Sequence, residues 1–327
     1  MAAAAGDILR LVRKGIDVKA VSANVRKPFR FYLCGDPAQV AAMRALLLDG
    51  QDETVPFDAA ACLETLSPNR TLATDARSGT LVLFLGRRGD VAAANLSELR
   101  AMRLPILAIT VDEAAQPSGP PAPPEPGSYA EYIVPAISCD ALRGRVFPHM
   151  IDCCKRVEIA VGRRLPVLRE TVAAKLTRDA ANNALKVALA SAVVDHIPVA
   201  GFVLGAFASA GDMVAITGIQ MMLLLHIEAT YGRDPDVQRM WQLLPVVGGG
   251  FGWRMLAREL SGFIPVAGIG IKGAIAYAGT IVVGEGVTFF LEHGQHMSSV
   301  QAGTIYENTK NEALKFARDI VARVTKR

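Results

Sequence analysis

The chain has 327 residues, of which 51% are apolar and 20% are charged, and its formal net charge is +4. This length is sufficient for two domains, and the apolar share is higher than in most soluble proteins of the same size. Because the net charge is small and no basic run is interleaved with aromatic residues, we set aside a nucleic-acid-binding function.

The cysteines predict neither a disulfide framework nor a metal site. An odd number of cysteines without a C-x-x-C pair is typical of reduced thiols in a cytosolic compartment. The five residues are Cys34, Cys62, Cys139, Cys153 and Cys154. The N-terminal residues lack a continuous apolar core followed by a cleavage site, so we expect no secretory signal.

Residues 1–27 predict a basic N-terminal helix. Asp7 would cap its start, and Ile8, Leu11 and Val12 would share one face. Two interpretations remain open: the helix lies on anionic lipid, or it is solvated and packs on the next domain.

Residues 28–154 predict an α/β domain with a mostly parallel sheet, because short apolar runs alternate with helix-like stretches. The expected strands are Phe29–Cys34, Thr54–Phe57, Leu81–Leu85, Pro105–Thr110 and Tyr132–Ile137. The expected helices are Pro37–Leu48, Val91–Met102 and Leu142–Val157. The proline-rich stretch Gln116–Ser128 predicts an extended surface loop.

This order of elements resembles a small GTPase domain of the Era-like kind. A GTPase uses a G-x-x-x-x-G-K-[ST] loop, in which backbone amides and the lysine bind phosphate and the hydroxyl holds magnesium. Gly35 stands at the first glycine of this loop. Val40, Ala41 and Ala42 replace the second glycine, the lysine and the hydroxyl, and Asp36 adds a negative charge where phosphate would bind.

The other GTPase motifs are degenerate as well. The strand that would precede the N-K-x-D motif runs into Thr110–Glu113, where an acidic residue is all that remains of the motif. Of the S-A-[KL] element, only the serine remains, as Ser138. No D-x-x-G precedes Leu81 in the expected frame. We therefore expect a GTPase-like domain that has lost nucleotide chemistry, without a cofactor and without catalytic residues.

Residues 155–300 predict an all-α domain that is partly transmembrane or re-entrant. The sequence IPVAG occurs at Ile197–Gly201 and again at Ile264–Gly268, which indicates an internal repeat. Both copies continue into apolar runs long enough for a bilayer crossing, which takes about 20 residues. Asp212 interrupts the first run, so this run is either a hairpin turning near Ser209–Asp212 or a helix whose Asp212 faces a protein interior.

Three ionisable residues within the apolar runs are candidate functional residues inside the membrane: Asp212, Lys272 and Glu285. A contact between Asp212 and Lys272 would lower the cost of both charges. Trp241–Trp253 fits a re-entrant or buried turn. The many glycines and alanines suit close helix packing either in lipid or in a soluble bundle. Glu292, His293 and His296 lack a further metal ligand, so no metal is expected.

A second resemblance rests on LPVLRETVAAKL, the two IPVAG copies, QLLPVVGGGFGWRMLAREL and AYAGTIVVGEG. In their order these segments resemble the bacterial domain of unknown function 697, which is related to YcjF-type inner-membrane proteins and often follows a GTPase domain. The likeness covers roughly residues 160–293. It implies membrane association and a protein partner, with a GTPase as the expected kind, and it implies no biochemical activity.

Residues 301–327 predict a C-terminal amphipathic helix that docks on the front domain or on a membrane surface. The favoured hypothesis is a non-catalytic scaffold or regulator at the bacterial inner membrane, with both terminal regions cytoplasmic, bound to lipid and a protein partner and open to homo-oligomer formation. The alternatives are a peripheral cytoplasmic protein, an active but atypical GTPase, and a pore or transport component built from the repeat.

Overall fold

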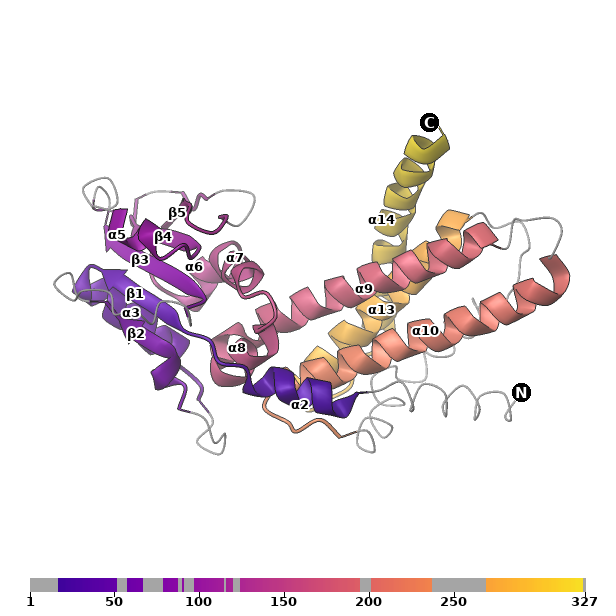
Figure 1. Ribbon diagram of the computed structural model, residues 1–327, viewed down its shortest axis with the longest axis horizontal. Helices are drawn as coiled ribbons and strands as arrows, with labels where there is room; N and C mark the ends of the chain where they lie inside the picture. The colour runs from indigo at the N-terminus through magenta and orange to yellow at the C-terminus, as the bar shows by residue number, and fades with distance from the viewer. Residues whose placement is uncertain are drawn as a thin grey trace. The chain divides into compact units, whose positions relative to one another are not determined.

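The computed structural model describes residues 17–51, 58–66, 79–87, 90, 97–114, 116–119, 124–194, 201–236 and 269–325. Contacts divide the chain into two compact units (Figure 1). The α/β unit comprises Ser22–Lys175 together with Ala229–Arg233. The helical unit comprises Met1–Val21, Leu176–Glu228 and Asp234–Arg327. The basic N-terminal helix was predicted over residues 1–27; residues 1–16 lie outside the described residues, and helix α2 (Val18–Arg26) lies in the remaining part of that range.

A five-stranded parallel sheet forms the core of the α/β unit. Its strands are β1 (Phe31–Gly35), β2 (Leu63–Thr65), β3 (Leu81–Arg87), β4 (Ile106–Val111) and β5 (Tyr129–Val134). They lie in the order β2-β1-β3-β4-β5, and every neighbouring pair is parallel. The predicted α/β class with a mostly parallel sheet is confirmed, because continuous apolar runs such as Leu81–Leu85 are buried throughout.

Short helices accompany the sheet: α3 (Pro37–Leu47), α5 (Ser97–Ala101), α6 (Cys139–Arg143), α7 (Val146–Cys153) and α8 (Glu158–Arg164). Helix α3 turns Val40, Met43 and Leu47 inward, which is the spacing of one helix face. Leu99 and Met102, at the end of α5, pack against the buried cluster that contains Tyr32 and Phe84.

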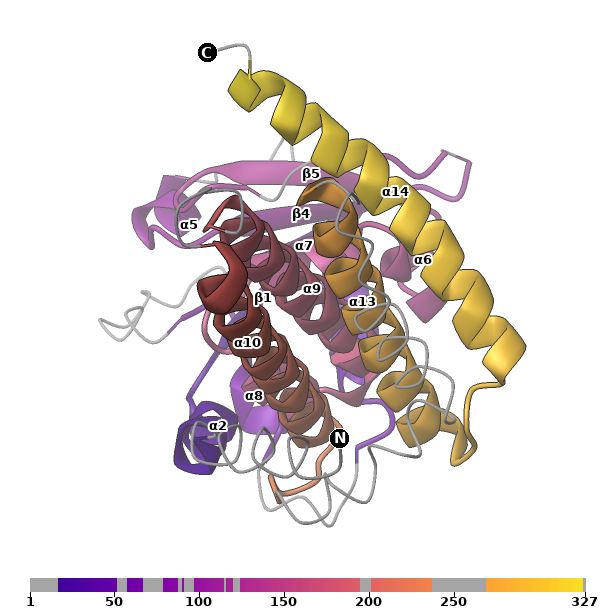
Figure 2. The same ribbon diagram turned by 90° about the vertical axis from the view of Figure 1, so that its right-hand side faces the viewer.

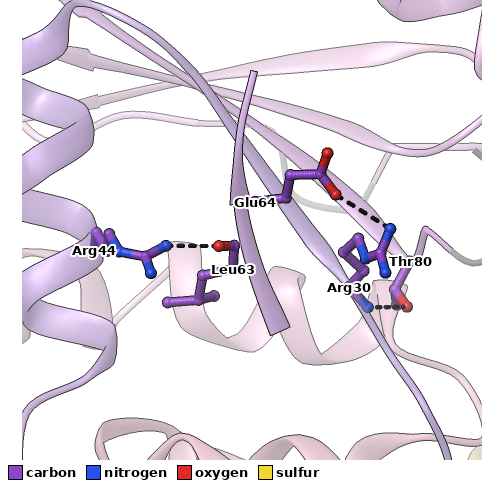
Figure 3. Close-up of polar contacts among 5 residues, drawn as sticks. All are labelled: Arg30, Arg44, Leu63, Glu64 and Thr80. Atoms are coloured by element: carbon purple, nitrogen blue, oxygen red, sulfur yellow. Dashed lines mark hydrogen bonds and ion pairs between the residues drawn. The ribbon is translucent and has the colours of Figure 1, made fainter. Parts of the chain in front are cut away.

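Polar contacts hold the short edge strand β2 (Figure 3). The Arg44 guanidinium of α3 donates to the Leu63 carbonyl at 2.6 Å. Arg30 pairs with Glu64 at 3.1 Å, and its backbone N–H donates to the Thr80 hydroxyl at 3.4 Å. These contacts explain how a three-residue strand with one buried side chain stays in register.

Several predicted elements differ from the structure. The helix predicted over Leu142–Val157 is wrong as one element, because α6 ends before Gly144 and Arg156 takes a positive φ of 73° that a helix does not allow. The strand predicted over Tyr132–Ile137 begins earlier, since Tyr129 pairs with Ile106. The strand predicted at Thr54–Phe57 lies outside the described residues, and β2 was not predicted.

Four long helices supply most of the described helical unit: α9 (Arg169–Val194), α10 (Gly201–Thr230), α13 (Ile269–His293) and α14 (Ser299–Thr325). The start of α9, up to Lys175, and the end of α10, from Ala229, are grouped with the α/β unit. Figures 1 and 2 show α9, α10 and α13 side by side, with α14 crossing α13. Their buried contacts use small residues: Ala184 and Ala188 of α9 meet Ile216 of α10 and Ala276 of α13. Between α13 and α14, Ala278 lies in one buried cluster with Ala302 and Tyr306.

The α9–α13 contact depends on two glycines of α13. A Cβ at Gly273 would meet the Leu185 and Leu189 side chains, and a Cβ at Gly284 would collide with Thr177. One buried polar link joins the next pair of helices, because Gln220 of α10 donates to the Thr280 hydroxyl of α13 at 3.2 Å. The Thr280 hydroxyl in turn donates to the Ala276 carbonyl at 2.8 Å.

Helix α10 is continuous from Gly201 to Thr230, so a hairpin turning near Ser209–Asp212 is wrong. The IPVAG copies and the Trp241–Trp253 turn lie wholly or mostly outside the described residues. By length and composition, one helix in the described part of the chain could cross a membrane, over Gly273–His293 of α13.

Candidate functional site

The turn between β1 and α3 occupies the position of the predicted phosphate loop. Strand β1 ends at Gly35 and helix α3 begins at Pro37, so Asp36 alone connects them. Asp36 is the N-cap residue of α3, and its Oδ1 accepts a hydrogen bond from the Gln39 N–H at 3.0 Å. A phosphate-binding loop instead wraps several free backbone amides around the anion.

The backbone amides of Asp36, Gln39 and Val40 in this turn are already engaged. The Val40 N–H donates to the Asp36 carbonyl at 2.9 Å, and Pro37 has no N–H to offer. The Asp36 carboxylate therefore takes the place at the helix N-terminus where a phosphate would bind, and it carries the same sign of charge. The geometry does not suit a triphosphate.

Gly35 brings β1 into close contact with β3. Its φ is +112°, and a Cβ at this position would collide with the Leu85 carbonyl oxygen. The next residue, Asp36, donates its N–H to the same oxygen at 2.8 Å. In a sheet of this strand order, ligands bind beyond the carboxyl ends of the strands where the winding reverses, between β1 and β3. Here a backbone hydrogen bond joins the two strands at that point.

The three residues that replace the glycine, the lysine and the hydroxyl of the predicted loop all lie on α3. Val40 is buried against the sheet, whereas Ala41 and Ala42 lie exposed on α3. None of the three side chains has a polar atom. The sequence did not indicate the capping role of Asp36, because this role depends on the one-residue turn.

Asp112 and Ser138, at the positions predicted for two other GTPase motifs, have local structural roles. Asp112, after β4, accepts a hydrogen bond from the Ala114 N–H at 3.1 Å, and its own N–H donates to the Val134 carbonyl. Ser138 caps α6, because its hydroxyl accepts from the Ala141 N–H. Both residues thus stabilise the start of a turn or helix.

Two polar pairs in the sheet were missed from the sequence. The Thr110 hydroxyl of β4 donates to Glu131 of β5 at 2.7 Å. The Tyr132 hydroxyl of β5 lies 2.7 Å from Nδ1 of His149 in α7. Burial raises the pKa of Tyr132, so its hydroxyl keeps the proton. The first pair depends on how β4 and β5 pair and the second on how α7 packs on the sheet, and neither is visible in the sequence.

The predicted intramembrane residues fall on two helices. Asp212 lies in α10 and Lys272 in α13, and their side chains are outside the described part, as is their predicted contact. Glu285 is exposed and lies within the candidate span Gly273–His293. No group of three histidine, cysteine or acidic residues within the described ranges is placed to hold a metal. His293 stacks on Phe289, and His296 stacks on Phe290.

Comparisons of the chain with protein-family models, with curated proteins and with solved structures gave no match.

Proposed function

We propose that this chain is a non-catalytic scaffold or regulatory protein, in which a GTPase-like α/β domain has lost nucleotide chemistry and a helical region associates with a membrane. The observation that carries the first part is the β1–α3 turn. It consists of Asp36 alone, and its carboxylate caps α3 where a phosphate would have to bind.

The membrane part is supported by the composition of α13. It has a mean hydropathy of 1.6 over a length sufficient for a crossing. Glycines 273 and 284 allow close helix contact, a packing mode that stabilises helices in lipid. We propose the bacterial inner membrane as the location, with lipid and a protein partner, expected to be a GTPase, as the molecules bound.

A single-turnover hydrolysis assay tests the loss of chemistry. Purified full-length chain in excess over labelled GTP and magnesium should release no phosphate above the rate in buffer. The matched variant Asp36→Ala should be equally inactive, because removing the carboxylate restores neither the lysine nor the hydroxyl. Phosphate release by the wild-type chain that stops in Asp36→Lys would contradict the proposal and favour the atypical GTPase.

One observation favours a second candidate, a pore or transport component. Glu285 is exposed within the candidate span, and an ionisable residue at that depth usually faces protein or a polar path. The prediction is cation flux into proteoliposomes that Glu285→Gln abolishes and Glu292→Gln, near the end of the span, does not. Equal absence of flux in all three proteins would leave the scaffold as the sole function supported.

A further inference from the structure

Helices α10 and α13 carry buried apolar residues on all sides, so apolar burial alone does not determine which of their faces meet. In α10 the successive residues Leu223, Leu224 and Leu225 are all buried, and in α13 Val282 and Val283 are both buried. Successive residues of a helix point about 100° apart. An amphipathic helix has its orientation set by one apolar stripe, whereas these two helices have apolar residues around their circumference.

One polar pair links the facing surfaces of α10 and α13 inside the helical unit. The Gln220 Nε2 of α10 donates to the Thr280 Oγ1 of α13 at 3.2 Å, and 1% of Gln220 and 0% of Thr280 are exposed. The Thr280 hydroxyl donates its single proton to the Ala276 carbonyl at 2.8 Å. Towards α10 this hydroxyl can therefore only accept, which fixes the direction of the pair.

A shift of α13 along its own axis would break this pair. One helical turn corresponds to about four residues and about 5.4 Å, so a shift by one turn brings Ala276 or Gly284 opposite Gln220. Neither residue has a polar side-chain atom. The Gln220 amide would then be buried without the Thr280 hydroxyl, and an unmet buried donor carries the full cost of its lost hydration. Apolar burial is non-directional, so it penalises the same shift less.

We propose that the Gln220–Thr280 pair is a register lock, which fixes the axial position and the rotation of α13 against α10. Gln220 is the positioning residue, because it supplies the donor that only Thr280 can meet. Gly284 of α13 fits the Thr177 side chain of α9, so this glycine positions α13 on α9 and leaves its place on α10 to the polar pair. The lock works in lipid and in a soluble bundle alike, because neither interior offers water to replace a lost partner.

A double-mutant cycle tests whether the two residues act as one unit. Removing one partner leaves the other buried without its hydrogen bond, whereas replacing both with apolar groups of similar shape is nearly neutral. Thr280→Val and Gln220→Leu should each lower the thermal midpoint of the full-length chain by about 2–8 °C, and the double variant should recover most of this loss. A loss in the double variant equal to the two single losses added together would overturn the lock.

Thr304→Val is the matched control for the loss of a threonine hydroxyl. This hydroxyl also donates to the carbonyl four residues earlier, Val300, at 3.0 Å, but it lies on the exposed side of α14. Its removal should leave the thermal midpoint unchanged. A decrease in Thr304→Val as large as that in Thr280→Val would overturn the lock, because the bond within the helix would then explain the effect.

Methyl NMR of the full-length chain, labelled at alanine and isoleucine, reads the register itself. Ala276 of α13 and Ile216 of α10 lie in one buried cluster, so the wild type should give one Ala276 resonance with a nuclear Overhauser effect to Ile216. In the double variant of Gln220 and Thr280, this resonance should split or broaden and the effect should weaken, while Ala108 of the sheet stays sharp. A single Ala276 resonance that keeps its full effect to Ile216 would overturn the proposal, because the register would then be fixed without the pair.

Discussion

Asp36 stabilises the fold at the position where the sequence predicts a degenerate phosphate loop. Its carboxylate satisfies an orphan N–H of α3 and interacts favourably with the positive end of the helix. The same oxygen atoms would repel a phosphate. The stabilisation of α3 and the expected repulsion of a phosphate have one cause. The Asp36 carboxylate already occupies the N-terminus of α3, where an anion would bind.

Asp36→Ala should lower the free energy of unfolding by about 1 kcal/mol, the usual cost of losing an N-cap. Asp36→Asn is the matched control and should cost less, because its side-chain oxygen can still accept from Gln39. Urea denaturation followed by circular dichroism measures both. A midpoint in Asp36→Ala equal to that of the wild type would show that the cap contributes nothing.

The cysteines differ in the predicted reactivity of their thiols. Burial raises the pKa of Cys34 to about 12 and that of Cys153 also to about 12, where Asp152 adds to the effect of burial. Since the thiolate is the nucleophile, Cys34 should resist iodoacetamide at pH 8 and react only after unfolding. Mass mapping of the native protein should find Cys139, which is half-buried, modified first. Labelling of Cys34 as fast as Cys139 would contradict this account.

The raised pKa of Cys34 also has a consequence for stability. The folded thiol loses its proton less readily than the unfolded thiol, whose pKa is near 9. The stabilising contribution is therefore complete below pH 9 and is lost as the pH rises toward about 12. Cys34→Ser removes this titration, and its unfolding free energy should fall less steeply over that range.

At the residue scale, the sequence shows which side chains stand at the motif positions, but not the contacts that these residues make in the fold. The sequence itself shows that Val40, Ala41 and Ala42 stand where a phosphate loop has its second glycine, its lysine and its hydroxyl. The contact of Gly35 with Leu85 could not be predicted, because it depends on how β1 and β3 pair. Likewise, nothing in the sequence near His149 indicates Tyr132 as its partner.

At the scale of elements, the glycines of α13 determine how closely the helices pack. Gly284→Ala should destabilise the helical unit by about 1–3 kcal/mol, since the added Cβ would overlap the Thr177 side chain and the packed helices would have to move apart. Gly218→Ala in α10 is the matched control. No atom outside its own helix lies within 4 Å of the added Cβ, so alanine should stabilise by about 0.5–1 kcal/mol.

Thermal unfolding of the purified full-length chain measures this pair. The account requires a lower midpoint for Gly284→Ala and an equal or higher midpoint for Gly218→Ala. Equal shifts in both variants would mean that helix propensity, rather than the α9–α13 contact, sets the effect of these glycines.

Elements with a continuous apolar run in the sequence were predicted, and elements without such a run were not. Continuous apolar runs gave β1, β3 and β4 nearly to their ends. Strand β2 has no such run and was not predicted. It is held in place by polar contacts, from Arg44 and from the Arg30–Glu64 pair, which the sequence pattern does not show. The helix predicted over Leu142–Val157 broke into pieces because Ser138 starts α6 early and Arg156 leaves the helical region.

At the scale of the whole molecule, the order along the chain does not define the compact units. A boundary placed at residues 154 and 155 separates the sheet from the helices in sequence. The contacts instead group Ala229–Arg233 with the sheet, through Arg163 and Gly162. Such a contact between residues far apart in the sequence has no local signature, because it depends on how the chain folds back.

The proposed membrane association can be tested on cells. The full-length chain should sediment with membranes and stay in the pellet after a carbonate wash, because apolar helices inserted in lipid are not released at high pH. A peripheral protein of the same host serves as the control and should be released. Complete release of the chain would refute insertion and favour the soluble bundle.

Calorimetric titration of the full-length chain with GTP and with GDP, in the presence of magnesium, tests the central claim most directly. The account predicts no heat of binding for either nucleotide up to millimolar concentration, and the same result for Asp36→Ala. Saturable binding of either nucleotide at micromolar concentration would contradict it, because the β1–α3 turn would then hold the phosphates that its carboxylate is expected to exclude.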